Sequence, residues 1–138
     1  MKTLLIILLA AVAPAAAQAQ TLQTELIPVR YEILAKGLDH PWGMAFLPDG
    51  GILVTERTGD LRLIDAGGRL QPTPIGGLPT VRQYGQGGLL DVALHPDFAS
   101  NRWVYLSYAE RDARGWGTAV ARGRLQGDEL SEVEVLFR

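Results

Sequence analysis

An internal repeat constrains the fold of this chain more than any other feature of its sequence. Residues 42–49 (WGMAFLPD) match residues 90–97 (LDVALHPD) at an offset of 48 residues. After an insertion of four residues, residues 52–55 match residues 104–107. Each copy is therefore interpreted as a strand, a Pro-Asp turn, a strand, a turn and a further strand. A period of about 40–50 residues with several short strands per unit is typical of β-propeller blades.

The sequence predicts strands throughout and no long helix. Short runs alternate apolar and polar side chains, which places one face of a strand inward. Clusters of Gly, Pro and Asp between these runs are typical of turns. After position 19, no window of eleven or more residues keeps a helical apolar stripe free of Gly and Pro. The predicted strands are residues 29–34, 42–47, 52–56, 60–64, 89–94, 103–108, 118–125 and 132–137.

These features predict an all-β protein of the β-propeller class. A closed propeller needs at least about four blades, whereas the repeat provides two copies and a trailing strand. We therefore expect residues 20–138 to form about the first two blades plus a trailing strand, an incomplete portion of a propeller domain. A small β-sandwich is the alternative fold for a two-copy repeat.

Residues 1–19 are predicted to be a signal peptide. Lys2 provides a positive start, residues 4–13 form an unbroken apolar run, and small residues precede a cleavage site after Ala19. The apolar run is shorter than the roughly 20 residues that span a bilayer, so a retained membrane anchor is the less favoured alternative. We expect a periplasmic or secreted protein with no membrane span after cleavage.

The composition of the chain argues against nucleic acid and anionic membranes as partners. The chain has 13 Lys and Arg against 15 Asp and Glu, for a net charge of −2, with the signs alternating along the sequence. Such a chain offers no basic surface for nucleic acid or for an anionic membrane. Cysteine is absent, so we expect stability to come from packing alone, although an exported protein could form disulfides.

Four segments carry a family resemblance: residues 40–50 (HPWGMAFLPDG), 53–57 (LVTER), 85–98 (GQGGLLDVALHPDF) and 104–108 (VYLSY). Together they resemble the N-terminal part of the soluble PQQ-dependent aldose (glucose/sorbosone-type) dehydrogenases. The resemblance extends from about Tyr31 to Arg138. The glycine-rich GQGGLL run followed by HPDF is its most specific element.

The resemblance implies a six-bladed propeller that binds pyrroloquinoline quinone (PQQ) and calcium over its central channel. It implies a quinoprotein oxidoreductase, in which PQQ takes a hydride from the anomeric carbon of an aldose and a separate electron acceptor reoxidises the cofactor. In that family the catalytic histidine follows a segment like residues 132–138, and the calcium ligands and most quinone-binding residues belong to later blades. We therefore expect no catalytic and no metal-binding residue in this chain, and no activity from it alone.

Gln86 is the one residue expected to bind substrate or cofactor. In the resembling enzymes a glutamine in this loop reaches the sugar near the quinone, and an amide can both donate to and accept from a hydroxyl. The alternative is a turn residue that satisfies local backbone groups between Gly85 and Gly87. The neighbouring glycines lack the spacing of a phosphate-binding loop.

The two histidines are expected to be structural. His95 precedes Pro96 at the end of a predicted strand and repeats the position of Leu47. His40 precedes Pro41, which favours an extended conformation, and we interpret it as a loop residue without a carboxylate partner.

Several acidic and aromatic residues are also interpreted as scaffold. Asp49 and Asp97 occupy equivalent turns, where the carboxylate can bond the backbone two residues on. Glu56 and Arg57 are expected to form an exposed ion pair or a contact along a strand. The residues expected to pack between blades are Trp42, Trp103, Tyr105 and Tyr108.

Two other functions stay open at this point. A non-enzymatic, secreted propeller could bind a ligand with the same scaffold, because a fold does not determine an activity. A metal-dependent lactonase propeller would need Glu, Asp and Asn ligands that converge at the channel, and the loops here offer few.

The first prediction concerns export. When the chain is expressed with its natural start, we expect the exported protein to begin at Gln20, because signal peptidase requires the small residues that precede the cut. N-terminal sequencing of the exported protein measures this. An intact Met1 in a membrane fraction would instead indicate a retained anchor.

Overall fold

The computed structural model describes residues 20–113 and 115–138, so the signal peptide predicted for residues 1–19 lies outside the described residues. The chain divides into two compact units, one ending at Leu34 and one from Ala35 to Arg138. In the first unit, β1 (Gln20–Gln23) pairs antiparallel with β2 (Pro28–Tyr31). Among the described residues, no helix is long and apolar enough to cross a membrane.

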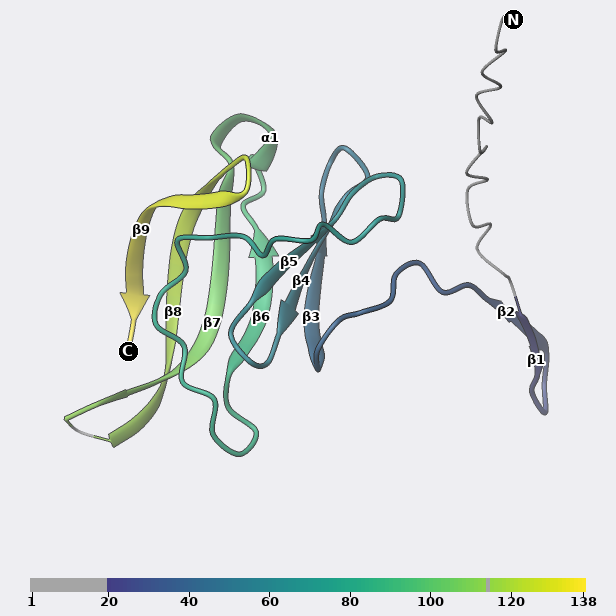
Figure 1. Ribbon diagram of the computed structural model, residues 1–138, viewed down its shortest axis with the longest axis horizontal. Helices are drawn as coiled ribbons and strands as arrows, with labels where there is room; N and C mark the ends of the chain where they lie inside the picture. The colour runs from purple at the N-terminus through teal and green to yellow at the C-terminus, as the bar shows by residue number, and fades with distance from the viewer. Residues whose placement is uncertain (1–19, 114) are drawn as a thin grey trace, which may run out of the picture. The chain divides into compact units, whose positions relative to one another are not determined.

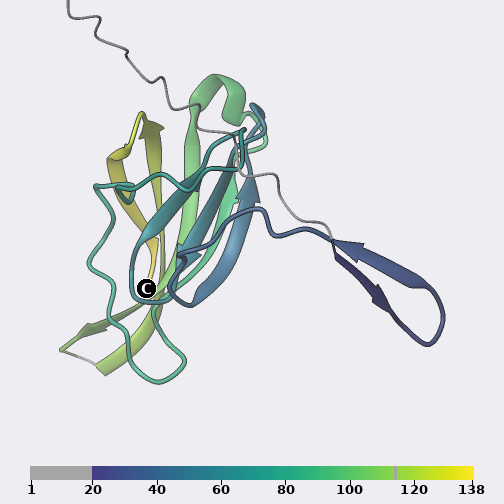
Figure 2. The ribbon, with the colours of Figure 1, turned by 45° about the vertical axis from the view of Figure 1, so that its right-hand side comes forward.

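The second unit consists of two antiparallel sheets (Figure 1 and Figure 2). The first sheet contains β3 (Pro41–Phe46), β4 (Ile52–Glu56) and β5 (Leu61–Ile64). The second contains β6 (Leu89–Leu94), β7 (Trp103–Asp112), β8 (Gly115–Gln126) and β9 (Glu129–Phe137). A single turn of helix, α1 (Phe98–Asn101), connects β6 to β7. The predicted all-β class is confirmed, and the two sheets are blades of a β-propeller.

The two sheets repeat the same register. Met44 pairs with Val54 in the first sheet, and Val92 pairs with Leu106 in the second, at the offsets of 48 and 52 residues that the sequence repeat predicts. Both pairings contain an irregularity just before these residues. The hairpin that follows is closed by equivalent hydrogen bonds, from Leu47 N–H to the Gly51 carbonyl and from His95 N–H to the Trp103 carbonyl.

One hydrophobic core lies between the two sheets. Along β7, Val104, Leu106 and Tyr108 contribute to it and are each at most 1% exposed. Leu53 and Leu61 of the first sheet are fully buried in the same cluster. Burial of one such side chain stabilises a fold by about 1.5–3 kcal/mol, so packing between the sheets is the main source of stability in a unit without disulfides.

The other face of the first sheet is partly covered by the segment that enters it. Ile52, Val54 and Ile64 form a second buried cluster, against which Ala35 and Leu38 pack. Trp42 on β3, which was predicted to pack between blades, is 53% exposed and does not belong to the core between these two sheets. Tyr108 alone among the four aromatic residues predicted between blades is fully buried.

The backbones of the two sheets approach each other closely at two glycines. A Cβ added at Gly43 would lie under 3.0 Å from the Asp91 carboxylate, and one added at Gly88 would lie under 3.0 Å from the Arg57 carbonyl oxygen. Thr55 bridges the same boundary, since its hydroxyl donates to the Leu90 carbonyl at 2.6 Å. A side chain at Gly88 would therefore overlap the backbone of the first sheet, whereas one at Gly43 would have to displace the Asp91 carboxylate.

The second prediction tests this contact. We expect Gly88→Ala to lower the free energy of unfolding by about 1–3 kcal/mol or more, because the added methyl overlaps backbone rather than a flexible side chain. Gly117→Ala is the matched control, since nothing lies within 4 Å of a Cβ built there. Urea unfolding of both variants measures the difference, and equal midpoints would contradict the contact.

Candidate functional site

Gln86 belongs to a tight turn of residues 84–87 that leads into β6. The chain enters β6 at the end of the second sheet away from α1 (Figure 1). Tyr84 N–H donates to the Gly87 carbonyl at 3.3 Å, and Gly87 N–H donates back to the Tyr84 carbonyl at 2.8 Å. Gln86 itself is exposed. Its side chain makes no hydrogen bond within residues 20–113 and 115–138, so the turn holds its own backbone without using the amide.

The backbone on either side fixes this turn to both sheets. Leu89 N–H donates to the Arg57 carbonyl at 3.2 Å, which connects the turn to the first sheet. Ala109 N–H donates to the Gly88 carbonyl at 2.7 Å, which connects it to β7. Gln86 is therefore presented from a rigid support rather than from a loose loop.

The hairpin beside this turn is longer than its counterpart in the first sheet. Thr55 pairs with Leu61, so residues 56–60 close the first hairpin, whereas the equivalent Ser107 pairs with Val120, so residues 108–119 close the second. The extension projects past the end of the second sheet, on the side where the chain enters β6 (Figure 1 and Figure 2). The two copies of the repeat thus differ in the length of this hairpin, near Gln86.

Trp116 of this extension stacks on Tyr84 of the turn. The ring centroids are 4.9 Å apart at an interplanar angle of 21°. The Arg111 guanidinium carbon lies 5.4 Å from the Trp116 ring centroid. Tyr84 is 69% exposed and Trp116 48% exposed, so this stack is a surface feature. The sequence analysis did not identify it.

A hollow of about 270 Å³ lies next to Trp116, with Glu110, Asp112 and Arg138 in its lining. Arg138 and Glu110 form an ion pair at 2.9 Å. Burial, and then the negative charge of Glu110, raise the pKa of Tyr108, so the phenol beneath this region stays neutral at physiological pH. The site therefore combines aromatic surface with carboxylates and one cation.

Glu56 differs from its prediction as an exposed partner of Arg57. Its side chain is 2% exposed and lies 3.4 Å from Arg62 rather than pairing with Arg57. One carboxylate oxygen also accepts the Asp39 N–H at 2.7 Å. Glu56 therefore clamps the segment that enters β3 onto the first sheet, and this pairing across the strand was not visible from the sequence.

The structure supports a scaffold role for His95. Its Nδ1 lies 3.0 Å from Asp97 N, which donates to it, and 2.8 Å from the Asn101 side-chain amide. Asp49 bonds the backbone two residues on, as predicted, through Gly51 N–H at 3.0 Å. Its counterpart Asp97 is the N-cap of α1 and makes no side-chain capping bond.

His40 differs from its prediction in two respects. Its φ is +49°, so it is not extended before Pro41. Its imidazole contacts the neighbouring Asp39 carboxylate, which the sequence analysis did not pair with it. Both side chains are mostly exposed.

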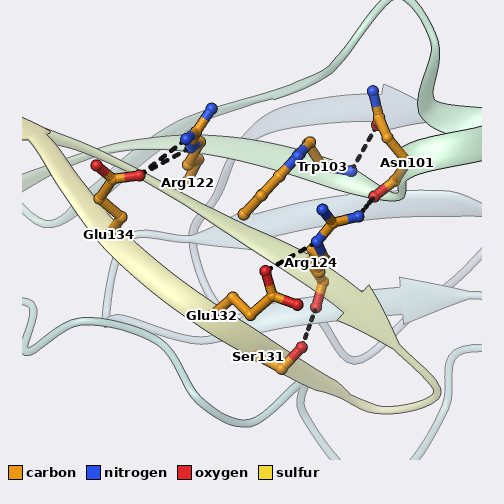
Figure 3. A network of polar contacts seen from close by, with 7 residues as sticks. All are labelled: Asn101, Trp103, Arg122, Arg124, Ser131, Glu132 and Glu134. Carbon is orange, nitrogen blue, oxygen red and sulfur yellow. Dashed lines mark hydrogen bonds and ion pairs between the residues drawn. The ribbon is translucent and has the colours of Figure 1, made fainter.

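A polar network covers part of the second sheet away from Gln86 (Figure 3). Trp103 lies between Arg122 and Arg124, and each guanidinium carbon is 4.4 Å from its ring centroid. The arginines pair in turn with Glu134 at 2.9 Å and with Glu132 at 3.0 Å. Hydrogen bonding to Glu134 raises the pKa of Arg122. The network joins β7, β8 and β9, and we interpret it as structural.

The profile of the Glucose / Sorbosone dehydrogenase family matches residues 38–138. The chain belongs to this family. Aldose sugar dehydrogenase YliI of Escherichia coli (strain K12) is 53% identical over 107 residues, which cover 76% of this chain and 28% of that protein. The predicted resemblance is confirmed, and the chain spans little more than a quarter of the length of that curated relative.

Solved structures of the family have the same fold over this region. A crystal structure of a glucose dehydrogenase is 51% identical with a TM-score of 0.71, over 76% of this chain and 31% of that one. The PQQ-bound aldose sugar dehydrogenase of Streptomyces coelicolor is 33% identical with a TM-score of 0.66, over 91% of this chain and 35% of that one.

The third prediction concerns Glu56. We expect Glu56→Ala to cost about 3–5 kcal/mol of stability, because it leaves Arg62, whose side chain is only 12% exposed, without a counter-charge. Glu134→Ala is the control, since it removes a carboxylate from a pair on the surface and should cost about 0–1 kcal/mol. Urea denaturation compares the two variants, and similar costs would show that the buried pair is not a clamp.

Proposed function

We propose that this chain supplies about the first two blades of a PQQ-dependent dehydrogenase that oxidises an aldose at its anomeric carbon. The observation that supports this most directly is Gln86, an exposed amide on a rigid turn, in a chain of the glucose/sorbosone dehydrogenase family. A PQQ-bound relative has the same fold over most of the chain.

Gln86 would hold a hydroxyl of the sugar beside the cofactor. Its amide can donate and accept at once, and its turn is already held by hydrogen bonds between Tyr84 and Gly87. Binding therefore orders only one side chain, which keeps the entropic cost of positioning the substrate low. When bound, PQQ supplies the hydride acceptor.

The described residues do not fit a calcium site. Within residues 20–113 and 115–138, no group of three or more His, Cys, Asp or Glu side chains lies close enough to hold a metal ion. We propose that the general-base histidine and the calcium ligands come from other parts of the enzyme. We also propose a periplasmic or secreted location and a separate electron acceptor as a partner.

The fourth prediction uses a chimera, in which the aligned part of this chain replaces the matching segment of the E. coli aldose sugar dehydrogenase, over the 107 residues of the alignment. With PQQ and calcium, we expect the chimera to oxidise glucose and the 138-residue chain alone to be inactive. Gln86→Ala should lower kcat/KM about tenfold, through loss of a hydrogen bond to the substrate.

Gln83 provides the matched control, because it is exposed in the same connection. Gln83→Ala in the chimera should change kcat/KM by less than about twofold, as expected for a surface substitution. A chimera that folds and takes up PQQ but oxidises no aldose would instead favour a binding propeller. Equal effects of the two substitutions would remove Gln86 from the site.

A further inference from the structure

We propose that this chain assembles head to tail with further copies of itself, in a closed ring of three in which β3 of each copy packs on the second sheet of the next. The inference is independent of the proposed activity, because it concerns the 138-residue chain by itself. Its evidence is an apolar face of the first sheet, which the internal repeat identifies as an interface between sheets.

One face of β3 is exposed although its side chains are large and apolar. Trp42, Met44 and Phe46 are 53%, 62% and 69% exposed. Ala45, which points the other way, packs on the core between the two sheets. The segment that enters β3 covers the neighbouring strands of the exposed face and leaves these three side chains open. Soluble proteins rarely expose an apolar row of this kind unless a partner covers it.

The equivalent face of the second sheet is buried in an interface. Met44 and its partner Val54 hold the positions of Val92 and Leu106 in the repeat. Val92 is 4% exposed and Leu106 is 1% exposed, because the first sheet packs on them. Met44 thus occupies the position that, in the second sheet, is buried against a preceding sheet. The exposed face of β3 is therefore built to receive another sheet.

The chain also contains the matching surface, on the face of the second sheet that is turned away from the first. This face repeats the positions through which the first sheet contacts the second: Ala93, Tyr105 and Ser107 correspond to Ala45, Leu53 and Thr55. A hollow of about 160 Å³ lies there, with Ala93, Tyr105 and Ser107 in its lining. One copy therefore carries both surfaces of a head-to-tail contact.

A hydroxyl on this second surface is placed like its counterpart at the existing boundary. The Thr55 hydroxyl accepts an N–H of β3 at 2.8 Å and donates to the Leu90 carbonyl of the facing sheet at 2.6 Å. The Ser107 hydroxyl accepts an N–H of β6 at 3.1 Å. Within the part of the chain that the structure describes, Ser107 donates to no other sheet. In the ring, its acceptor is the Trp42 carbonyl of the next copy, the counterpart of the Leu90 carbonyl.

The two surfaces differ from each other, so their contact leads to a closed ring or to an open filament. Closed propellers contain roughly four to eight blades, and each copy provides two. The matched part of this chain covers 31% of the glucose dehydrogenase chain that has the same fold. Three copies therefore provide about as many blades as one such enzyme, and this determines the size of the ring.

The fifth prediction is measured on the purified chain by size-exclusion chromatography with light scattering. At about 100 µM we expect a mass of about three chains. Met44→Asp should raise the dissociation constant about thirtyfold or more, because it buries an unpaired charge in the contact. Leu26→Asp is the matched control, since Leu26 is 92% exposed in the separate first unit and should leave the mass unchanged.

A mixture of two variants tests the direction of the contact. Ala93→Arg blocks the second sheet as Met44→Asp blocks β3, so each variant alone should be a monomer. Both positions are exposed, so both variants keep the fold. Mixed together, they should form a pair and no larger species, because one intact contact remains. If they do not pair although the unchanged chain assembles, the head-to-tail arrangement is wrong.

A monomer at about 100 µM would overturn the proposal and assign both surfaces to another polypeptide, such as further blades of the proposed dehydrogenase. Assemblies that grow beyond three copies as the concentration rises would overturn the ring. Because the mass of the chain alone is measured, neither result bears on the oxidation of glucose by the chimera. Failure of this inference and failure of the proposed function are therefore distinguishable.

Discussion

At two glycines the backbones of the two sheets approach each other without space for a larger side chain, and the rest of the structure depends on this contact. At Gly43 and at Gly88, even a Cβ would lie under 3.0 Å from the facing sheet. This closeness lets the leucine and valine side chains of both sheets fill one continuous core. Because Leu53 of the first sheet and Leu106 of the second are buried in the same cluster, separating the sheets would expose apolar surface to water, so each sheet stabilises the other.

The same contact between the sheets also fixes the position of the candidate site. The Arg57 carbonyl that excludes a side chain at Gly88 also accepts the Leu89 N–H at 3.2 Å. The first sheet therefore fixes the point at which the chain enters β6, and the turn with Gln86 comes directly before it. Glu56, buried next to Arg57, holds the segment that enters β3 in a similar manner. Buried polar contacts at this end thus support exposed polar groups.

The sequence predicted the strands and their register well, because alternation and repetition are local or periodic signals. The offset of 48 residues reappears as the pairing of Met44 and Val92 with equivalent partners. It did not predict the burial of Glu56, whose partner Arg62 lies on the neighbouring strand and has no recognisable spacing. Nor did it predict the contact of Tyr84 with Trp116, because that contact depends on a longer hairpin, which a repeat alignment treats as an insertion. Gln86 was found only because its motif resembles a known family.

Two tryptophans of the second sheet, Trp103 and Trp116, differ in the side chains that surround their rings. Trp103 lies between the guanidinium groups of Arg122 and Arg124 (Figure 3). Both arginines form ion pairs with glutamates, so the contacts of this ring stay within the sheet. Trp116 instead stacks on Tyr84, which remains 69% exposed. The charges around Trp103 are paired, whereas the stack of Trp116 leaves Tyr84 exposed in the same turn as Gln86. The second sheet gains residues at both ends relative to the first, in the connection that contains α1 and in the β7–β8 hairpin, and only the hairpin extends the surface beside Gln86.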